Sequence, residues 1–161
     1  MRNNSIDLWE RVNTLEISSE TSMLAIRQMN TGPISQLVLR SSGEADKANC
    51  YKVIRAMVFS LLQFFGTTWN DFQVEECTKA IYREYYYWHL ADLKKFMTLC
   101  YGGKYGKVYG FFNPALLMEW AALYDAMWLS ASEEISINKA NEYRQRREEE
   151  QSLKDFINND I

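Results

Sequence analysis

The sequence has little proline, glycine or histidine. Only two prolines and seven glycines occur among 161 residues, which argues against a loop-rich all-β fold because such folds need many turns. There is one histidine, His89, and the three cysteines lie far apart. These four residues cannot supply the several nitrogen and sulfur ligands of a structural zinc site. We therefore expect no metal ion and no other cofactor.

The cysteines also exclude a disulfide framework. Cys50, Cys77 and Cys100 are odd in number and form no Cys-x-x-Cys pair, and each lies among apolar residues at helical spacing. Secreted domains stabilised by disulfides usually have an even number of cysteines. The pattern predicts reduced cysteines in the core of a cytosolic protein.

No long hydrophobic run is present. The most apolar segment, residues 56–65, is interrupted by Ser60 and Gln63, whereas a membrane-spanning helix needs about 20 apolar residues. The first seven residues also lack the continuous apolar stretch of a signal peptide. We expect a soluble, intracellular protein of the cytoplasm with no membrane partner.

The net charge of −3 is unevenly distributed. Residues 1–132 contain 13 basic and 13 acidic residues, whereas residues 133–161 contain 5 basic and 8 acidic residues. The molecule as a whole has no basic field that would attract nucleic acid, but its neutral body leaves room for a local basic patch. We expect a helical globular domain over 1–132 and a charged, exposed helical tail over 133–161.

Apolar residues recur mostly at spacings of three and four, which indicates amphipathic helices. The 14% of aromatic residues should dominate the core. Residues 34–39 are ambiguous between a short strand and a helical turn. The sequence predicts an all-α fold, a compact single-domain bundle of about six helices with a charged C-terminal tail. The expected helices cover about 6–16, from Ser18 or Ser19 to about 30, 44–65 before Gly66, 71–88 after a start at Thr67, Thr68 or Asn70, 90–101, and 114–130 after Asn113.

No catalytic motif is apparent. The spacing of His89 does not support a nucleophilic pair with Cys77 or Cys100, and Gly103–Gly106 lacks the Ser or Thr of a nucleotide-binding loop. Acidic residues occur in adjacent pairs, as at 75–76 and 133–134, and these diverge on a helix surface. We expect no enzyme; a small enzyme with an unfamiliar site is a minor alternative.

One stretch combines glycine, lysine and tyrosine. Four of the seven glycines fall within residues 102–110, which predicts an irregular loop or a tight turn. Glycines let a backbone approach a phosphate closely, lysines neutralise the phosphate, and aromatic rings stack on bases. In the alternative interpretation, Tyr105 and Tyr109 anchor the loop to the helices and the lysines are solvated. The candidate binding residues are Lys94, Lys95, Lys104, Tyr105, Lys107 and Tyr109.

Residues 90–96 (Leu-Ala-Asp-Leu-Lys-Lys-Phe), residues 103–109 (Gly-Lys-Tyr-Gly-Lys-Val-Tyr) and a following helix with Trp120 and Tyr124 form a combined pattern. This pattern resembles an uncharacterised family of short helical proteins from Bacteroidales phages and integrated mobile elements. The resemblance covers about residues 70–125. Some of these proteins lie near replication genes, so the resemblance implies a DNA-replication accessory or helicase-loader-like role. The family has no established catalytic residues.

Two functional hypotheses follow. In the first, the chain is a non-enzymatic accessory protein that binds DNA or a replication protein through the Gly-Lys-Tyr-Gly-Lys turn, with Lys94 and Lys95 widening the basic patch. In the second, it is a protein–protein adaptor or host-factor inhibitor that does not bind nucleic acid. The acidic tail and the apolar residues Phe111, Phe112 and Trp128 motivate the second hypothesis. Residues 133–161 lack sustained apolar heptads, which disfavours a coiled coil, and the oligomeric state stays open.

Overall fold

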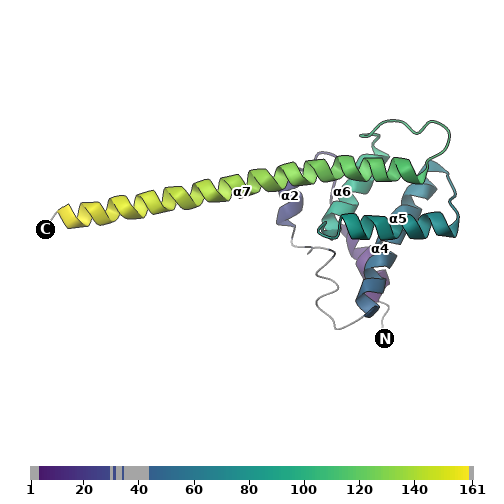
Figure 1. The fold of residues 1–161 in the computed structure, drawn as a ribbon, viewed down its shortest axis with the longest axis horizontal. Helices are drawn as coiled ribbons and strands as arrows, with labels where there is room; N and C mark the ends of the chain where they lie inside the picture. The colour runs from purple at the N-terminus through teal and green to yellow at the C-terminus, as the bar shows by residue number, and fades with distance from the viewer. Residues whose placement is uncertain (1–3, 30, 32–33, 35–43, 160–161) are drawn as a thin grey trace. The chain divides into compact units, whose positions relative to one another are not determined.

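The structure is a computed structural model that describes residues 4–29, 31, 34 and 44–159. These residues form six helices and no strand, so the predicted all-α fold is confirmed (Figure 1). No helix in the described residues is long and apolar enough to cross a membrane. The helices are α1 (Asn4–Thr14), α2 (Met23–Gln28), α4 (Glu44–Phe65), α5 (Asp71–Glu84), α6 (Leu90–Tyr101) and α7 (Pro114–Asn159).

The chain divides into two units, Met1–Asp125 and Ala126–Ile161. The division lies earlier than the boundary expected between 132 and 133. The predicted end of a helix near residue 130 is wrong, because α7 continues from the first unit into the second without a break. The Ser132 hydroxyl donates to the Trp128 carbonyl (2.8 Å), a bond to the preceding turn that a helix accommodates.

Aromatic side chains fill the core of the first unit, as their abundance predicts. Trp88, Phe96, Trp120 and Tyr124 are all buried. Trp88 meets Tyr124 edge-on at 4.8 Å between ring centroids and lies 5.7 Å from Phe96. Such tilted and edge-on contacts are the geometries that aromatic pairs prefer. This cluster joins α6 to the first turns of α7 and supports the segment between them.

Two local signals set the junction between α4 and α5. Gly66, at φ 62°, ends α4, and the Thr67 N–H donates to the Leu62 carbonyl (3.0 Å). This bond and the left-handed glycine form the Schellman arrangement. Asn70 then begins α5 with a capping box: its side chain accepts from the Gln73 N–H (2.9 Å), and the Gln73 side chain accepts from the Asn70 N–H (3.0 Å). Both helix ends lie where the sequence predicts them.

Helix α5 ends at Glu84, so the predicted extension to residue 88 is wrong. The chain turns instead, and the Trp88 N–H donates to the Tyr85 carbonyl (3.0 Å). The two rings stack at 4.5 Å, and Trp88 is fully buried. Burying this large ring against the core outweighs the local helical periodicity of the aromatic run, because a Trp side chain buries a large apolar area.

The second helix begins later than predicted. Its N-cap is Ser22, whose hydroxyl accepts from the Ala25 N–H (3.1 Å). Ser18 instead starts a turn, in which the Thr21 hydroxyl accepts from the Ser18 N–H (2.9 Å). Of the ambiguous segment 34–39, only Ile34 lies within the described residues; it is buried, and its N–H donates to the Trp88 carbonyl (2.8 Å).

The three cysteines are buried thiols, as predicted from their spacing. Burial raises the pKa of the Cys77 and Cys100 thiols above its ordinary value, because a thiolate is poorly solvated there. A thiol held in this way is a weak nucleophile. These cysteines therefore contribute to core packing.

Candidate functional site

The glycine- and lysine-rich segment connects α6 to α7 and begins with a helix-ending motif. Gly103 has φ 71°, its N–H donates to the Cys100 carbonyl (3.2 Å), and the Lys104 N–H donates to the Leu99 carbonyl (3.0 Å). This pair of bonds is again the Schellman arrangement, which favours glycine at the left-handed position. Lys104 is thereby fixed directly after the helix end, and its side chain is exposed.

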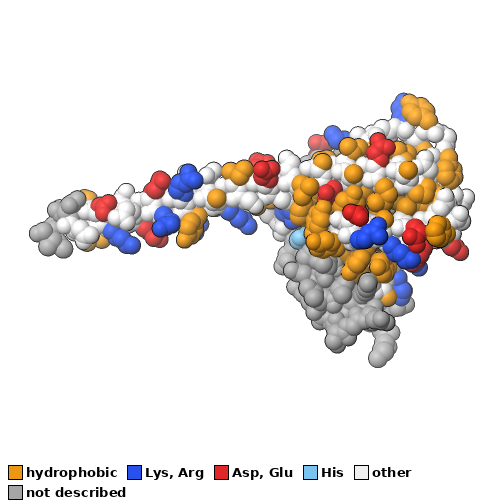
Figure 2. All heavy atoms as spheres, in the orientation of Figure 1, with side chains coloured by type: hydrophobic (Ala, Val, Ile, Leu, Met, Phe, Trp, Pro, Cys, Tyr) orange, Lys and Arg blue, Asp and Glu red, His pale blue; other side chains and the backbone are white. Residues whose placement is uncertain are grey.

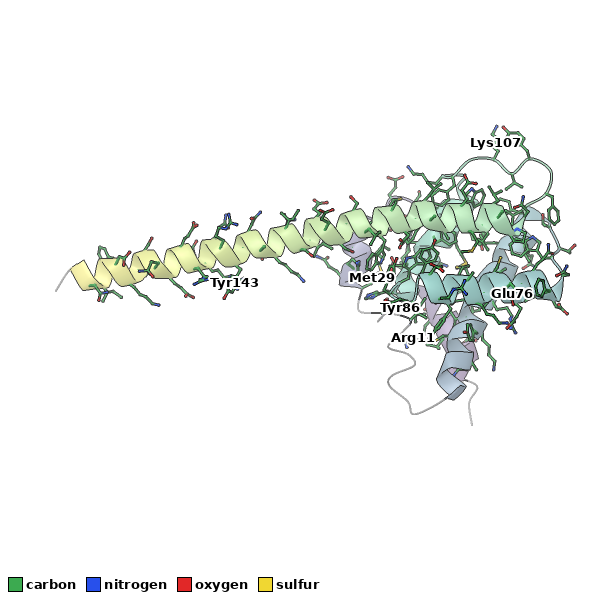
Figure 3. The ribbon with its side chains drawn as sticks, in the orientation of Figure 1. Arg11, Met29, Glu76, Tyr86, Lys107 and Tyr143 are labelled. Atoms are coloured by element: carbon green, nitrogen blue, oxygen red, sulfur yellow. The ribbon has the colours of Figure 1, made fainter. Side chains whose placement is uncertain are left out.

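A second glycine shapes the turn. The Gly106 N–H donates to the Gly103 carbonyl (3.1 Å), and Gly106 has φ 114°, a conformation that L side chains rarely adopt. Lys107 follows and is exposed. In Figure 2 a cationic side chain lies beside a hydrophobic one at the end of this loop, and Figure 3 identifies the cation as Lys107, directed away from the helices of its unit.

The two tyrosines of the turn have different environments. Tyr105 is half-buried, with ring centroids 6.2 Å from Phe96 and 5.9 Å from Trp120. Burial raises the pKa of its hydroxyl above the ordinary value, and the hydroxyl has no hydrogen-bond partner among the described residues. Tyr109 is 86% exposed. Tyr105 is therefore placed as the anchoring interpretation expects, whereas Tyr109 is open to a ligand.

The lysine pair on α6 is split between surface and interior. Lys95 is only 2% exposed, and its ammonium donates to the carbonyls of Ser18 (2.9 Å) and Ser19 (2.7 Å). Lys94 is half-exposed and donates to the Asn13 carbonyl (3.3 Å). Lys95 is therefore occupied with the chain before α2, and the expectation that it widens a surface patch does not fit its placement.

The Lys104 charge still acts on Lys95. The pKa of Lys95 is lowered chiefly by burial, while the Glu20 charge raises it and the Lys104 charge lowers it. The side chains available to a ligand at the turn are therefore Lys104, Lys107 and Tyr109.

A buried carboxylate, Asp92, lies in the first turn of α6. Asp92 is fully buried; one oxygen accepts from the Tyr124 hydroxyl (2.6 Å) and the other from the His89 N–H (2.7 Å). Burial raises the pKa of Tyr124 and the Asp92 charge raises it further, whereas burial lowers the pKa of His89 against the opposing effect of Asp92. An acidic residue three positions after a helix start is a local capping signal. The long-range bond to Tyr124 has no such signal.

The described residues contain no group of three or more His, Cys, Asp or Glu side chains placed to hold a metal ion. His89 is half-buried at the start of α6, and burial lowers its pKa. What the turn offers is two exposed ammonium groups and one exposed phenol ring, groups that bind phosphates and stack on planar rings.

Comparisons of this chain with protein-family models, with curated proteins and with solved structures find no match.

Proposed function

We propose that this chain is a non-enzymatic accessory protein of a phage or mobile element, associated with DNA replication, that binds DNA or a replication partner through its Gly-Lys-Tyr-Gly-Lys turn. The observation that carries the proposal is the exposure of Lys104, Lys107 and Tyr109 on a turn anchored by Tyr105. The association with phages and replication rests on the resemblance of residues 70–125.

The chemistry of the turn suits a polyanion with planar rings. Gly103 and Gly106 carry no side chain, and a Cβ atom at either would meet no neighbouring atom within 4 Å. A phosphate can therefore approach the backbone here, between two lysines that neutralise its charge. Tyr109, at 86% exposure, adds a surface on which an unpaired base can stack.

Two or three lysines neutralise few phosphates, so the binding is weak and depends strongly on salt. In a plot of the logarithm of the binding constant against the logarithm of the salt concentration, each neutralised phosphate contributes roughly −0.9 to the slope for duplex DNA. For single strands the contribution is about −0.7. A slope of about −2 to −3 is expected on this basis. A much steeper slope would indicate a larger basic surface than this turn provides.

The test is fluorescence anisotropy of labelled single- and double-stranded DNA, titrated with the protein at low and moderate salt. The variant Lys104→Ala/Lys107→Ala should lose most of the affinity and flatten the salt slope by about 2. The matched control is Lys52→Ala/Lys154→Ala, which removes the same charge from two exposed positions on other parts of the chain. Equal affinities of the two variants would remove the turn from the proposal.

The tyrosine can be tested separately. Tyr109→Ala should weaken binding to single strands more than to duplex, because only unpaired bases expose their faces for stacking. Tyr86→Ala is a suitable control, since Tyr86 is also exposed but lies outside the turn. Equal loss on both DNA forms would show that Tyr109 supports the turn and does not stack on a base.

The adaptor hypothesis has support of its own. Phe64 and Tyr101 are 55% and 37% exposed, with ring centroids 4.5 Å apart, and Phe111 is 52% exposed. Neighbouring exposed aromatic rings are typical of protein–protein contacts. Phe112, by contrast, is fully buried against Trp69 and cannot form part of such a surface. If the protein binds no DNA even at low salt, Phe64→Ser and Phe111→Ser are the variants to test against a protein partner.

A further inference from the structure

The second unit, Ala126–Ile161, presents a helix whose side chains are exposed along most of its length. Every described side chain from Ser136 to Asn158 is exposed, including five large apolar ones: Ile137 (53%), Tyr143 (67%), Leu153 (62%), Phe156 (69%) and Ile157 (60%). Charged and apolar side chains alternate along it in Figure 2. Most helical stability in proteins comes from packing of one face, so this helix has a face that a partner would stabilise.

Six of these residues lie on one stripe of the helix. They are spaced by four, three, four, three and four residues, which keeps them on a single face. The outer members are mainly apolar, and the two central ones carry opposite charges. The stripe consists of Lys139, Tyr143, Arg146, Glu150, Leu153 and Ile157.

The stripe is complementary to itself in one orientation only. When two copies lie antiparallel about Glu148, Tyr143 of each faces Leu153 of the other, and Arg146 of each faces Glu150 of the other. In a parallel pair, Arg146 would face Arg146 and Glu150 would face Glu150, which places like charges together. The charge pattern therefore selects the antiparallel arrangement.

The residues beside the stripe extend this complementarity. Arg147 is next to Arg146, and Glu149 is next to Glu150, so a basic pair on one copy lies against an acidic pair on the other, twice by symmetry. At the ends, the aliphatic stem of Lys139 faces Ile157 of the other copy, a contact that leaves the ammonium group in water.

We infer that two copies of this chain associate through antiparallel pairing of residues 139–157. This inference is independent of the proposed DNA binding. It does not need the apolar heptads that the tail lacks, because opposite charges fill the central positions of the stripe. The resulting dimer is weak and sensitive to salt, since exposed ion pairs contribute little individually and are screened.

Sedimentation equilibrium of the full chain over a range of protein concentrations at low salt tests the pairing. The wild-type protein should dimerise reversibly. Arg146→Glu and Glu150→Arg should each raise the dimer dissociation constant by roughly tenfold or more, because each places like charges together in two symmetric contacts. Circular dichroism of each variant checks that the helix is retained.

Two further samples separate pairing between copies from a change within one helix, since Arg146 and Glu150 are also four residues apart on the same helix. An equimolar mixture of the two single variants should dimerise, because a chain with glutamate at both positions then faces a chain with arginine at both. The double variant Arg146→Glu/Glu150→Arg should regain the wild-type affinity. A mixture that stays monomeric, or a monomeric wild-type protein, overturns the inference.

Orientation is measured with a single spin label. At Ile157→Cys the two labels of an antiparallel dimer are about 27 Å apart along the axis, since roughly 18 residues separate the two positions at about 1.5 Å each. In a parallel pair the two labels lie at the same level of the helices, so a short distance between them would contradict the proposal. The native cysteines are buried, which favours selective labelling.

Discussion

The Tyr124 hydroxyl donates a 2.6 Å hydrogen bond to Asp92, and neither side chain has any exposed surface. This contact joins the first turn of α6 to α7. A buried carboxylate is costly unless its oxygens are hydrogen-bonded. The pair therefore adds a buried polar contact to the aromatic cluster that joins the two helices in the first unit.

Replacing Tyr124 by Phe should destabilise the protein by about 1–3 kcal/mol, because Asp92 loses a donor that water cannot replace. Urea denaturation followed by circular dichroism measures the loss. Tyr143→Phe is the control, since Tyr143 is 67% exposed and its hydroxyl remains solvated. Equal stability of Tyr124→Phe and the wild type would mean that Asp92 finds another donor.

Stability should fall as the pH rises above about 10. Burial, together with Asp92, raises the pKa of Tyr124 above its ordinary value, and burial also raises the pKa of Tyr105 and Tyr87. The unfolded chain releases these protons near about pH 10 while the folded chain keeps them, so the stabilisation is complete below that pH and lost above it. The lowered pKa of Lys95 acts in the opposite direction.

Denaturation midpoints measured from about pH 8 to 11 check this prediction. In Tyr124→Phe the decline above about pH 10 should be shallower than in the wild type, because one raised ionisation is gone. Identical slopes would show that Tyr124 ionises in the folded protein as it does in the unfolded chain.

Lys95 should affect stability and leave DNA affinity unchanged. Lys95→Met leaves the carbonyls of Ser18 and Ser19 without their ammonium donor, which should lower the free energy of unfolding by about 1–3 kcal/mol. Amide hydrogen exchange of residues 18–21 should become faster. Lys94→Met is the matched control, because the Lys94 ammonium makes one exposed, longer contact. A loss of DNA binding in Lys95→Met at unchanged stability would return Lys95 to the binding surface.

Gly103→Ala should lower the free energy of unfolding by about 1 kcal/mol. The reason is that φ 71° is a left-handed conformation, which a residue with a Cβ atom adopts only with strain even though the Cβ meets no neighbour here. Gly103→Asn should cost less, since Asn tolerates this conformation at helix ends. Gly106→Ala should cost more, because φ 114° lies further from any conformation that alanine adopts readily. Thermal unfolding gives the order; the same cost for Ala and Asn at position 103 would contradict the conformational explanation.

The elements set by local chemistry were predictable from the sequence. Helix α4 and its end at Gly66 follow from periodicity and one glycine, and the starts at Asn70 and Asn113 follow from side chains that cap the next turn. The end of α5 was not predictable, because the aromatic run through Trp88 keeps a helical period. Partners distant in the sequence account for the turn, among them the ring of Tyr124, which Trp88 contacts.

The same distinction holds for the candidate site. The glycines predicted the irregular turn, and the exposed positions of Lys104 and Lys107 agree with their polar character. The burial of Lys95 could not be predicted from its own segment, because the carbonyls that bind it lie 77 and 76 residues earlier in the chain. Sequence periodicity does not predict the burial of a side chain whose partners lie this far away in the chain.

The anchoring of Tyr105 between Phe96 and Trp120 has a consequence for molecular recognition. Lys104 and Lys107 lie on either side of a residue held by the core, so the backbone entropy of ordering the turn is lost when the chain folds and is not lost again on binding. The anchor limits where the backbone carries the two lysines, while their flexible side chains set the range of charge separations that a ligand can match.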